Sequence, residues 1–516
     1  MKLLVKLQNE VEMNSIETLS QECDVLYGKI YQYNYGLMKR SEDLALEDKY
    51  SFNDIFDFYI TSNMQSWLKN GFYGYWFSPG MMMNSRCIIE GLALKAMYDS
   101  GDISQDQIEL LQKQVFLIEY NCYKKFSDIS QEFLFPDKLR YDWEQACSYY
   151  TEKLKDKFSN QKIQKIIESS NPFLCDEKLS YHKIIETYLG KEFAVWYGIL
   201  SQCSHPSDNT FYQNQNTLPL LLGIYELIRK NYGNLPDSRL TLTSYTNMCM
   251  SGEGANRFLD LVKKECSYLQ GIADVFEQHF SNNYVSNTLQ TLCLLMQEMA
   301  FDNLTGLNEQ VKSKWKIMLE LMASFYYCYL TETFTPQRYD LLVMHTDMQY
   351  SRNIEIDYDM SDAYECYKKI YPNGCDAEVF AENFRSVAGY TIDENGHSKS
   401  LSAMVRNFIS EFDRSPNRDR AMYLDYFESQ MISHANGYMW FANSGAFMDV
   451  NNIFSAIDIG IDLILRKMHL LFKMHSVAEE SKEYKNVINV LRNASKKLSP
   501  IFAEKYKLLL APKIHL

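Results

Sequence analysis

The chain has 516 residues, of which 46% are hydrophobic and 23% charged, so we expect a globular protein with more than one packing unit rather than a disordered chain. Its formal net charge of −14 argues against a protein that holds DNA by bulk electrostatic attraction, but a local positive cleft for RNA stays compatible with it. Only 11 prolines and 21 glycines interrupt the chain, which favours long helices.

The first residues, MKLLVKLQNEVEMN, contain an apolar run that is too short for the core of a secretion signal. The most apolar later stretch, 453–472, carries four charged residues that a lipid bilayer would not accommodate easily. The 12 cysteines are scattered without a C-x-x-C pair, a pattern typical of reduced thiols rather than of disulfides or a zinc site. We therefore expect a cytoplasmic protein with no membrane partner, no metal and no cofactor.

Helical periodicity dominates the rest of the chain. Expected helices span 84–102, 103–126, 141–158, 180–203, 216–232, 256–280, 284–301, 308–334, 361–371, 376–387, 400–412, 418–435, 450–475 and 478–508. Sustained period-2 alternation with hairpin turns is not found, so little sheet is expected. The sequence predicts an all-α fold.

Residues 231–256 interrupt this pattern with Gly, Asn, Ser and Thr. We place a linker at 236–255, between an N-terminal helical domain at 1–235 and a C-terminal helical domain at 256–516. The sequence thus predicts two helical bundles in tandem.

Short motifs recur in the two halves. Tyr197 precedes His205 by eight residues, and Tyr426 precedes His434 by the same distance, with a serine before each histidine. Arg86 and Arg338 also lie at similar distances from the start of their halves. We favour a diverged duplication; coincidence is the alternative, because tyrosine is frequent here and the match is short.

Arg86 and Glu90 lie four residues apart on an apolar helix, so their side chains share one face. A buried Arg needs a partner, and a carboxylate one turn away can provide it. The pair is either a structural clamp or an oriented cation beside a cleft, and we favour the clamp.

Tyr197, Ser201 and His205 recur every four residues in KEFAVWYGILSQCSHPS, and therefore line one helix face that ends at Pro206. His205 could serve as a general base, with Ser201 orienting it or contacting a substrate. The alternative is structural: both side chains would form hydrogen bonds at a helix end.

The R-x-x-x-E helix followed by Y-x-x-x-S-x-x-x-H-P-S resembles a bacterial helical domain family of unknown function, similar to HEPN-like bundles. The resemblance covers roughly 55–235, and its residues are Arg86, Glu90, Tyr197, Ser201, His205, Pro206 and Ser207. It implies an all-helical protein, usually dimeric, and an activity as a metal-independent RNase of toxin or anti-phage systems. In such RNases an Arg and a His in an R-x(4–6)-H motif act on the RNA phosphate.

The first half departs from that motif, because Arg86 and His205 lie on different expected helices. The second half contains RYDLLVMH, in which six residues separate Arg338 from His345, so both would share one helical face. Such a spacing also arises by chance, and Tyr339 replaces the polar residue often found after the Arg. We therefore favour the interpretation that His345 is a structural histidine on a partly buried helix face.

Two functions remain open. The first is an effector acting on RNA, in which His205 is the general acid/base and Arg86 stabilises the phosphorane charge, with Glu90, Ser201 and Tyr197 beside them. Second-half candidates are Arg338, His345, Tyr426 and His434. The second is a non-catalytic sensor or scaffold that binds a protein partner, such as one encoded nearby, or a small ligand. A homodimer is compatible with either function.

Overall fold

The protein is all-α in a computed structural model, and no strand occurs among the residues that the structure describes. These residues are 14–45, 52–76, 78–127, 137–168, 180–204, 218–279, 284–330, 336–353, 355–412, 422, 426, 429, 450–471 and 481–510. The predicted fold class is therefore confirmed.

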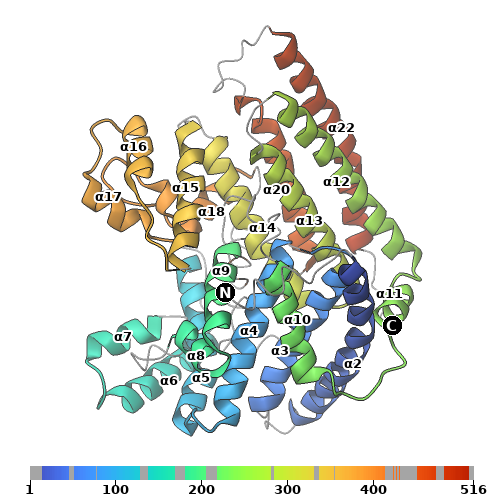
Figure 1. Cartoon of the computed structure of the whole chain (residues 1–516), viewed down its shortest axis with the longest axis vertical. Helices are drawn as coiled ribbons and strands as arrows, with labels where there is room; N and C mark the ends of the chain where they lie inside the picture. Colours follow the sequence, from blue (N-terminus) through green and yellow to red (C-terminus); the bar gives the residue numbers. More distant parts are fainter. Residues whose placement is uncertain are drawn as a thin grey trace.

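The lower part of the molecule is a layer of long helices from the first half of the chain (Figure 1). They are α2 (Asn14–Ala45), α3 (Phe52–Phe72), α4 (Pro79–Asp99) and α10 (Leu218–Tyr232). Asp57 on α3 connects them, because it accepts hydrogen bonds from Tyr33 on α2 at 2.7 Å and from Tyr232 on α10 at 2.8 Å. Lys95 on α4 pairs with the same carboxylate at 3.1 Å. One carboxylate thus fixes four helices relative to one another.

The upper part is a second bundle, built from the second half of the chain (Figure 1). Its helices are α12 (Glu253–His279), α13 (Tyr284–Leu304), α14 (Asn308–Tyr329), α20 (Val450–Lys467) and α22 (Lys482–Leu510). Buried Lys505 on α22 pairs with Glu265 on α12 and with Asp458 on α20, so three of these helices meet at one ammonium group.

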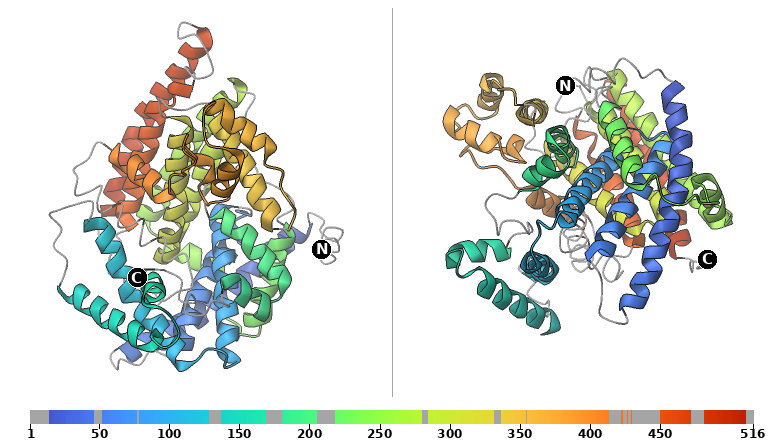
Figure 2. Two further views of the ribbon diagram at one scale, coloured as in Figure 1. Left: turned by 90° about the vertical axis from the view of Figure 1, so that its left-hand side faces the viewer. Right: turned by 60° about the horizontal axis from the view of Figure 1, so that its bottom comes forward.

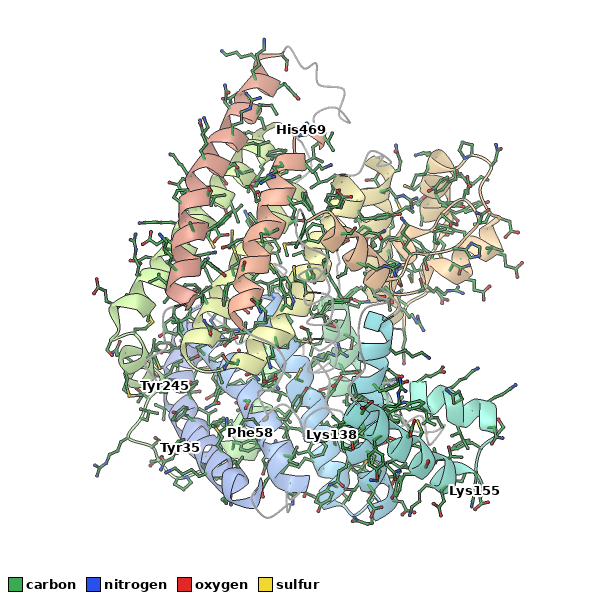
Figure 3. The ribbon with its side chains drawn as sticks, turned by 180° about the vertical axis from the view of Figure 1, so that it is seen from behind. Tyr35, Phe58, Lys138, Lys155, Tyr245 and His469 are labelled. Carbon is green, nitrogen blue, oxygen red and sulfur yellow. The ribbon has the colours of Figure 1, made fainter. Side chains whose placement is uncertain are left out.

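Two further groups of helices project from these bundles (Figure 2). The first has α5 (Gln105–Ser127), α6 (Asp137–Leu154) and α7 (Asn160–Glu168), which enclose a small core of their own. The second has α15 (Pro336–Asn353), α16 (Ser361–Ile370), α17 (Ala377–Phe384), η4 (Gly389–Thr391) and α18 (Leu401–Ser410). Figure 3 places Lys155, in the turn between α6 and α7, at the outer end of the first group.

The two halves do not have separate interiors. Among the described residues, the buried hydrophobic side chains of α2–α4 and of α12–α14 belong to one continuous core. The two bundles therefore share their main packing core.

The expected helices did not include α2, α3 and α7, and two expected segments also differ from the structure. The helix expected at 180–203 is two helices, α8 (Tyr181–Tyr188) and α9 (Lys191–Cys203), because Gly190 between them has a φ of 103°. The expected linker at 236–255 contains helix α11 (Leu242–Cys249). A capping box between Thr241 and Ser244 begins α11, and Tyr245 fixes it by donating to the carbonyl of Thr305 at 3.0 Å.

Candidate functional site

Helix α9 carries Tyr197 into the region where the two bundles meet. It packs against α4, α8 and α15, and lies near the centre of the molecule (Figure 1). Gly198 allows the close approach to α15, since a Cβ at this position would lie 2.8 Å from Oδ1 of Asn353. The sequence thus places a glycine beside Tyr197, where the Asn353 side chain at the end of α15 contacts α9.

Arg86 and Glu90 form the ion pair that their spacing predicts. Nε of Arg86 lies 3.2 Å from Oε1 of Glu90, and the side chains are 4% and 0% exposed. Tyr197 donates its hydroxyl to the same Oε1 at 2.9 Å, and its ring centroid lies 5.6 Å from the guanidinium carbon. The structure thus brings together three of the five first-half site residues around one carboxylate.

Burial and the neighbouring carboxylate set the protonation states of this group. Burial lowers the pKa of Arg86, but Glu90, Tyr197 and Cys87 together outweigh this effect, so the net shift is upward. Burial and then Glu90 raise the pKa of Tyr197, which keeps its hydroxyl protonated as a donor. The arrangement therefore favours a charged guanidinium and a neutral phenol at neutral pH.

Ser204, at the C-terminal end of α9, receives a second contact from Arg86. Nη1 of Arg86 donates to Oγ of Ser204 at 2.7 Å, and that hydroxyl donates to the carbonyl of Ser201 at 2.7 Å. Ser201 therefore takes part through its backbone, and its side chain lies half-buried. Ser204 is completely buried and was not among the predicted site residues.

A second cation, from the other half of the chain, reaches Ser204. Lys316 on α14 donates from Nζ to the carbonyl of Ser204 at 2.9 Å and lies 3.8 Å from Glu320. Glu320 in turn accepts from the hydroxyl of Tyr426 at 2.8 Å. Burial is the main cause that lowers the pKa of Lys316.

We call this group the Ser204 cluster; it comprises Arg86, Glu90, Tyr197, Ser204, Lys316, Glu320 and Tyr426. Sequence reasoning missed Lys316 and Glu320, although they show the same signal as Arg86 and Glu90, a cation and a carboxylate at i, i+4 on an apolar helix.

The Ser204 cluster has balanced charge and little access to solvent. Two cations face two carboxylates, and none of these four side chains is more than 4% exposed. An anionic ligand at Arg86 would have to displace Glu90, which would leave a buried carboxylate without its cation. The geometry of the described residues therefore suits a structural connection better than an open catalytic site.

Arg338 and His345 lie on α15 and hold a different part of the structure. Arg338, 6% exposed, donates to the carbonyls of Ile392 at 2.7 Å and Tyr390 at 3.4 Å, and to the hydroxyl of Tyr371. His345, 4% exposed, has Nε2 at 2.7 Å from the carbonyl of Ser386. Arg338 thus attaches α15 to η4 and to the end of α16, and His345 attaches it to the turn between α17 and η4.

Burial lowers the pKa of His345 to about 4, which the hydrogen bond to Ser386 only partly opposes. The imidazole is therefore neutral near pH 7, with its Nε2–H donated to the carbonyl. His345 has the character of a satisfied core histidine rather than of a group ready to transfer protons.

His205 and His434, together with Pro206 and Ser207, lie outside the described residues. His205 directly follows Ser204 in the chain, and His434 follows Tyr426 by eight residues. The structure therefore places the residue before His205 at the meeting point of two cations.

A second buried group of charges connects the halves, and we call it the Asp302 cluster. It comprises Ser66, Lys69, Asn84, Glu298, Asp302 and Lys314. Asp302 on α13 pairs with Lys69 on α3 and, at 2.5 Å, with Lys314 on α14. Ser66 donates to Asp302 at 3.1 Å and accepts from Asn84 at 2.8 Å and from Lys314 at 2.9 Å.

The lysines and carboxylates of the Asp302 cluster respond differently to burial. Burial raises the pKa of Asp302, but Lys314 and Lys69 outweigh it, so the net shift is downward. Burial lowers the pKa of Lys69 to about 8, against its usual 10.5, and raises that of Glu298. Lys69 is thus the cation of this cluster that is closest to losing its proton.

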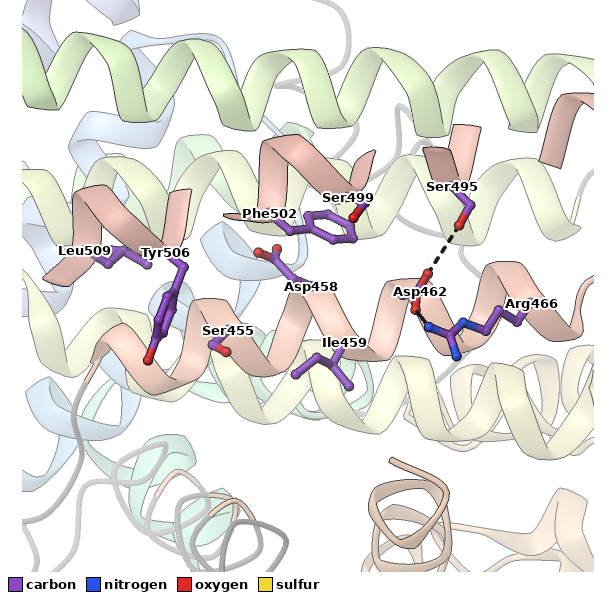
Figure 4. Close-up of a pocket in the computed structure, with 10 residues that line it drawn as sticks. All are labelled: Ser455, Asp458, Ile459, Asp462, Arg466, Ser495, Ser499, Phe502, Tyr506 and Leu509. Atoms are coloured by element: carbon purple, nitrogen blue, oxygen red, sulfur yellow. Dashed lines mark hydrogen bonds and ion pairs between the residues drawn. The ribbon is translucent and has the colours of Figure 1, made fainter. Parts of the chain in front are cut away.

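A surface pocket of about 270 Å³ lies between α20 and α22 (Figure 4). Its carboxylates already have partners: Asp458 pairs with Lys505 at 2.5 Å, and Asp462 pairs with Arg466 and accepts from Ser495 at 3.4 Å. The pocket therefore offers little uncompensated charge to a ligand.

Within the described ranges, no helix combines the length and the apolar character needed to cross a bilayer. In the same part of the chain, no three His, Cys, Asp or Glu side chains gather in a group that could hold a metal ion.

Comparison of the chain with known protein families, with curated proteins and with solved structures finds no match. The function is therefore argued from the residues of this chain alone.

Proposed function

We propose that the protein is a non-catalytic helical scaffold, in which the Ser204 cluster joins the two halves and holds the end of α9 in place. The observation that carries this proposal is the burial and pairing of Arg86, which is 4% exposed and bound to both Glu90 and Ser204. Its binding partner would be a protein or a small ligand, engaged elsewhere on the surface.

The physical argument rests on what a catalytic arginine must do. Stabilising a phosphorane requires preorganised donors that already point to the place where the charge develops. Nε and Nη1 of Arg86 are already committed, and withdrawing them would leave Glu90 buried without its cation, at a cost of several kcal/mol. The Arg86 side chain is thus better suited to holding structure than to binding phosphate.

A metal-independent RNase is the second candidate, and one observation favours it. Arg86 and Lys316 both donate to Ser204, the residue directly before His205. Two cations next to a histidine would suit acid/base chemistry at a phosphate, as the resemblance to HEPN-like bundles implies. In this alternative His205 is the acid/base, and Arg86 and Lys316 position it.

Induced expression in a bacterial host separates the two candidates. Growth and total RNA integrity would be compared for the wild type, His205→Ala and His434→Ala, with His397→Ala as a control because that side chain is 80% exposed. The scaffold proposal expects intact RNA and normal growth in all four strains.

RNA cleavage or growth arrest by the wild type, lost in His205→Ala or His434→Ala but kept in His397→Ala, would overturn the scaffold proposal. Circular dichroism of each purified variant would show that the loss is not caused by unfolding. The site would then be assigned to the histidine whose substitution removes the activity.

A further inference from the structure

The second half of the chain contains a copy of the arrangement around Glu90. In the first half, Glu90 accepts from Tyr197 at 2.9 Å and pairs with Arg86, four residues before it. In the second half, Glu320 accepts from Tyr426 at 2.8 Å and pairs with Lys316, also four residues before it. Both carboxylates are completely or almost completely buried, at 0% and 1% exposure. Each half thus has a cation, a buried carboxylate that pairs with this cation, and a tyrosine that donates to the carboxylate.

The spacing along the chain is the same to within one residue. Tyr197 follows Arg86 by 111 residues, and Tyr426 follows Lys316 by 110 residues. A serine and a histidine then stand seven and eight residues after each tyrosine. A chance pairing of side chains would not be expected to preserve three successive intervals.

The helices that carry these residues correspond in order and in packing. In the first half α2 packs on α3, α3 on α4, and α4 on α8; in the second α12 packs on α13, α13 on α14, and α14 on α18. Helices α3 and α13 have 21 residues each, and α4 and α14 have 21 and 22. The cation and the carboxylate therefore occupy the third helix of an equivalent set in each half (Figure 1).

We propose that Lys316, Glu320 and Tyr426 form a second half-site, equivalent to Arg86, Glu90 and Tyr197, and that the chain is a duplicated helical unit whose half-sites meet at Ser204. Lys316 replaces Arg338 as the counterpart of Arg86. The contact is unequal, because Arg86 binds the hydroxyl of Ser204 and Lys316 binds its carbonyl.

The proposal concerns how the two halves of the chain depend on each other, as well as how the chain arose by duplication. The second half contributes Lys316 to the end of α9, where it donates to the carbonyl of Ser204, so the two half-sites are joined through this residue. His205 and His434 take equivalent positions in the sequence after their tyrosines, and Ser433 takes that of Ser204. This inference does not depend on whether the protein is a scaffold or an RNase.

Thermal unfolding of the full-length chain tests the equivalence. The variants are Tyr197→Phe and Tyr426→Phe, with Tyr150→Phe as the matched control, because Tyr150 is also buried but donates to a neutral carbonyl, that of Leu110, at 2.6 Å. Hydrogen bonds to charged groups contribute about twice as much as those to neutral groups. We expect Tyr197→Phe and Tyr426→Phe to lower the unfolding midpoint by similar amounts, each about twice the drop of the control.

Double-mutant cycles then show which carboxylate each tyrosine depends on. The drop caused by Tyr426→Phe should shrink to that of the control in a Glu320→Gln background and stay larger in a Glu90→Gln background. Tyr197→Phe should show the opposite dependence.

The proposal is overturned if Tyr426→Phe lowers the midpoint no more than Tyr150→Phe does, a result that needs no glutamine variant to fold. It is equally overturned if the two tyrosine variants differ severalfold, or if the effect of Tyr426→Phe does not depend on Glu320.

Discussion

The Ser204 cluster and the Asp302 cluster both join the two halves, but they distribute charge differently. In the Ser204 cluster each cation has a carboxylate one helical turn away, Arg86 with Glu90 and Lys316 with Glu320. In the Asp302 cluster one carboxylate pairs with Lys69 from the first half and Lys314 from the second. The Ser204 cluster therefore joins two neutral ion pairs through Ser204. The Asp302 cluster instead pairs a carboxylate of the second half with lysines from both halves.

This difference has an energetic consequence. A buried pair that is neutral within its own helix can be replaced as a unit, because no charge is left without a partner. Removing the carboxylate that two lysines share leaves buried Lys69 without its carboxylate, whereas Lys314 keeps Glu298 at 3.3 Å. We therefore expect the contact between the halves to depend most on Asp302, and the following predictions test this order.

Asp302→Asn should produce the largest loss. It leaves buried Lys69 without its carboxylate and Lys314 with Glu298 alone, and we expect the free energy of unfolding to fall by about 3–5 kcal/mol. Urea denaturation followed by circular dichroism would measure it, with Asp274→Asn, an exposed carboxylate on α12, as the control. A loss below about 1 kcal/mol would contradict the role given to Asp302.

Arg86→Met should cost slightly less, about 3 kcal/mol, because Glu90 loses its cation but keeps the hydrogen bond from Tyr197. Adding Glu90→Leu should restore about half of this loss, since the pair is then removed as a unit. The same urea experiment measures both variants. If the double variant is less stable than Arg86→Met, the view of a self-contained neutral pair is wrong.

Gly80→Ala tests how closely α4 packs on the Asp302 cluster. A Cβ at Gly80 would lie 1.8 Å from Oε2 of Glu298 and 2.6 Å from Cε of Lys314, so we expect a loss of about 1–3 kcal/mol through overpacking. Gly271→Ala on α12 is the matched control, because nothing lies within 4 Å of its Cβ position. The control should gain about 0.5–1 kcal/mol through helix propensity, and equal effects at the two glycines would refute the prediction.

Lys69 should give the smallest and most specific effect, a dependence on pH. Its pKa is about 8 in the folded protein, against a usual 10.5, so between these values the unfolded chain retains a proton that the folded chain has lost. The free energy of unfolding therefore rises with pH in this window, by at most about 1.4 kcal/mol per pH unit. Below pH 8 Lys69 is protonated in both the folded and the unfolded protein, so its effect on the free energy of unfolding no longer changes with pH.

Lys69→Met should abolish this rise, and urea denaturation at pH 8, 9 and 10 for both proteins would measure it. The difference between the two proteins isolates Lys69, since the other groups of the cluster, Asp302, Lys314 and Glu298, remain in both. A difference that stays flat from pH 8 to 10 would show that Lys69 keeps an ordinary pKa.

Much of the fold was predictable because it is local. The periodicity of 84–102 anticipates α4, which begins five residues earlier, where Ser78 caps the helix and Pro79 follows. The helix expected at 180–203 failed at Gly190, whose left-handed conformation divides it. The helix of residues 242–249 was missed because a Ser- and Thr-rich segment was interpreted as a linker, although Thr241 and Ser244 cap α11.

The candidate site was predictable only in part. The spacing of Arg86 and Glu90 predicts their ion pair, because residues one turn apart meet on any helix. Arg338 and His345 show an equally regular spacing, yet they bind backbone carbonyls of the 386–392 segment. The spacing of residues places their side chains on one face of a helix, but it does not determine which part of the structure that face contacts.

The sequence by itself determined the helical class, the apolar faces and the cation–carboxylate pairs within single helices, since these depend on neighbours within about two turns. Only the tertiary structure decided that Tyr197 donates to Glu90, that Lys316 reaches Ser204, and that Lys69 pairs with Asp302, 233 residues further along the chain. The reason is physical: a buried charge must find a partner in the core, and packing of helices far apart in sequence determines which partner is within reach.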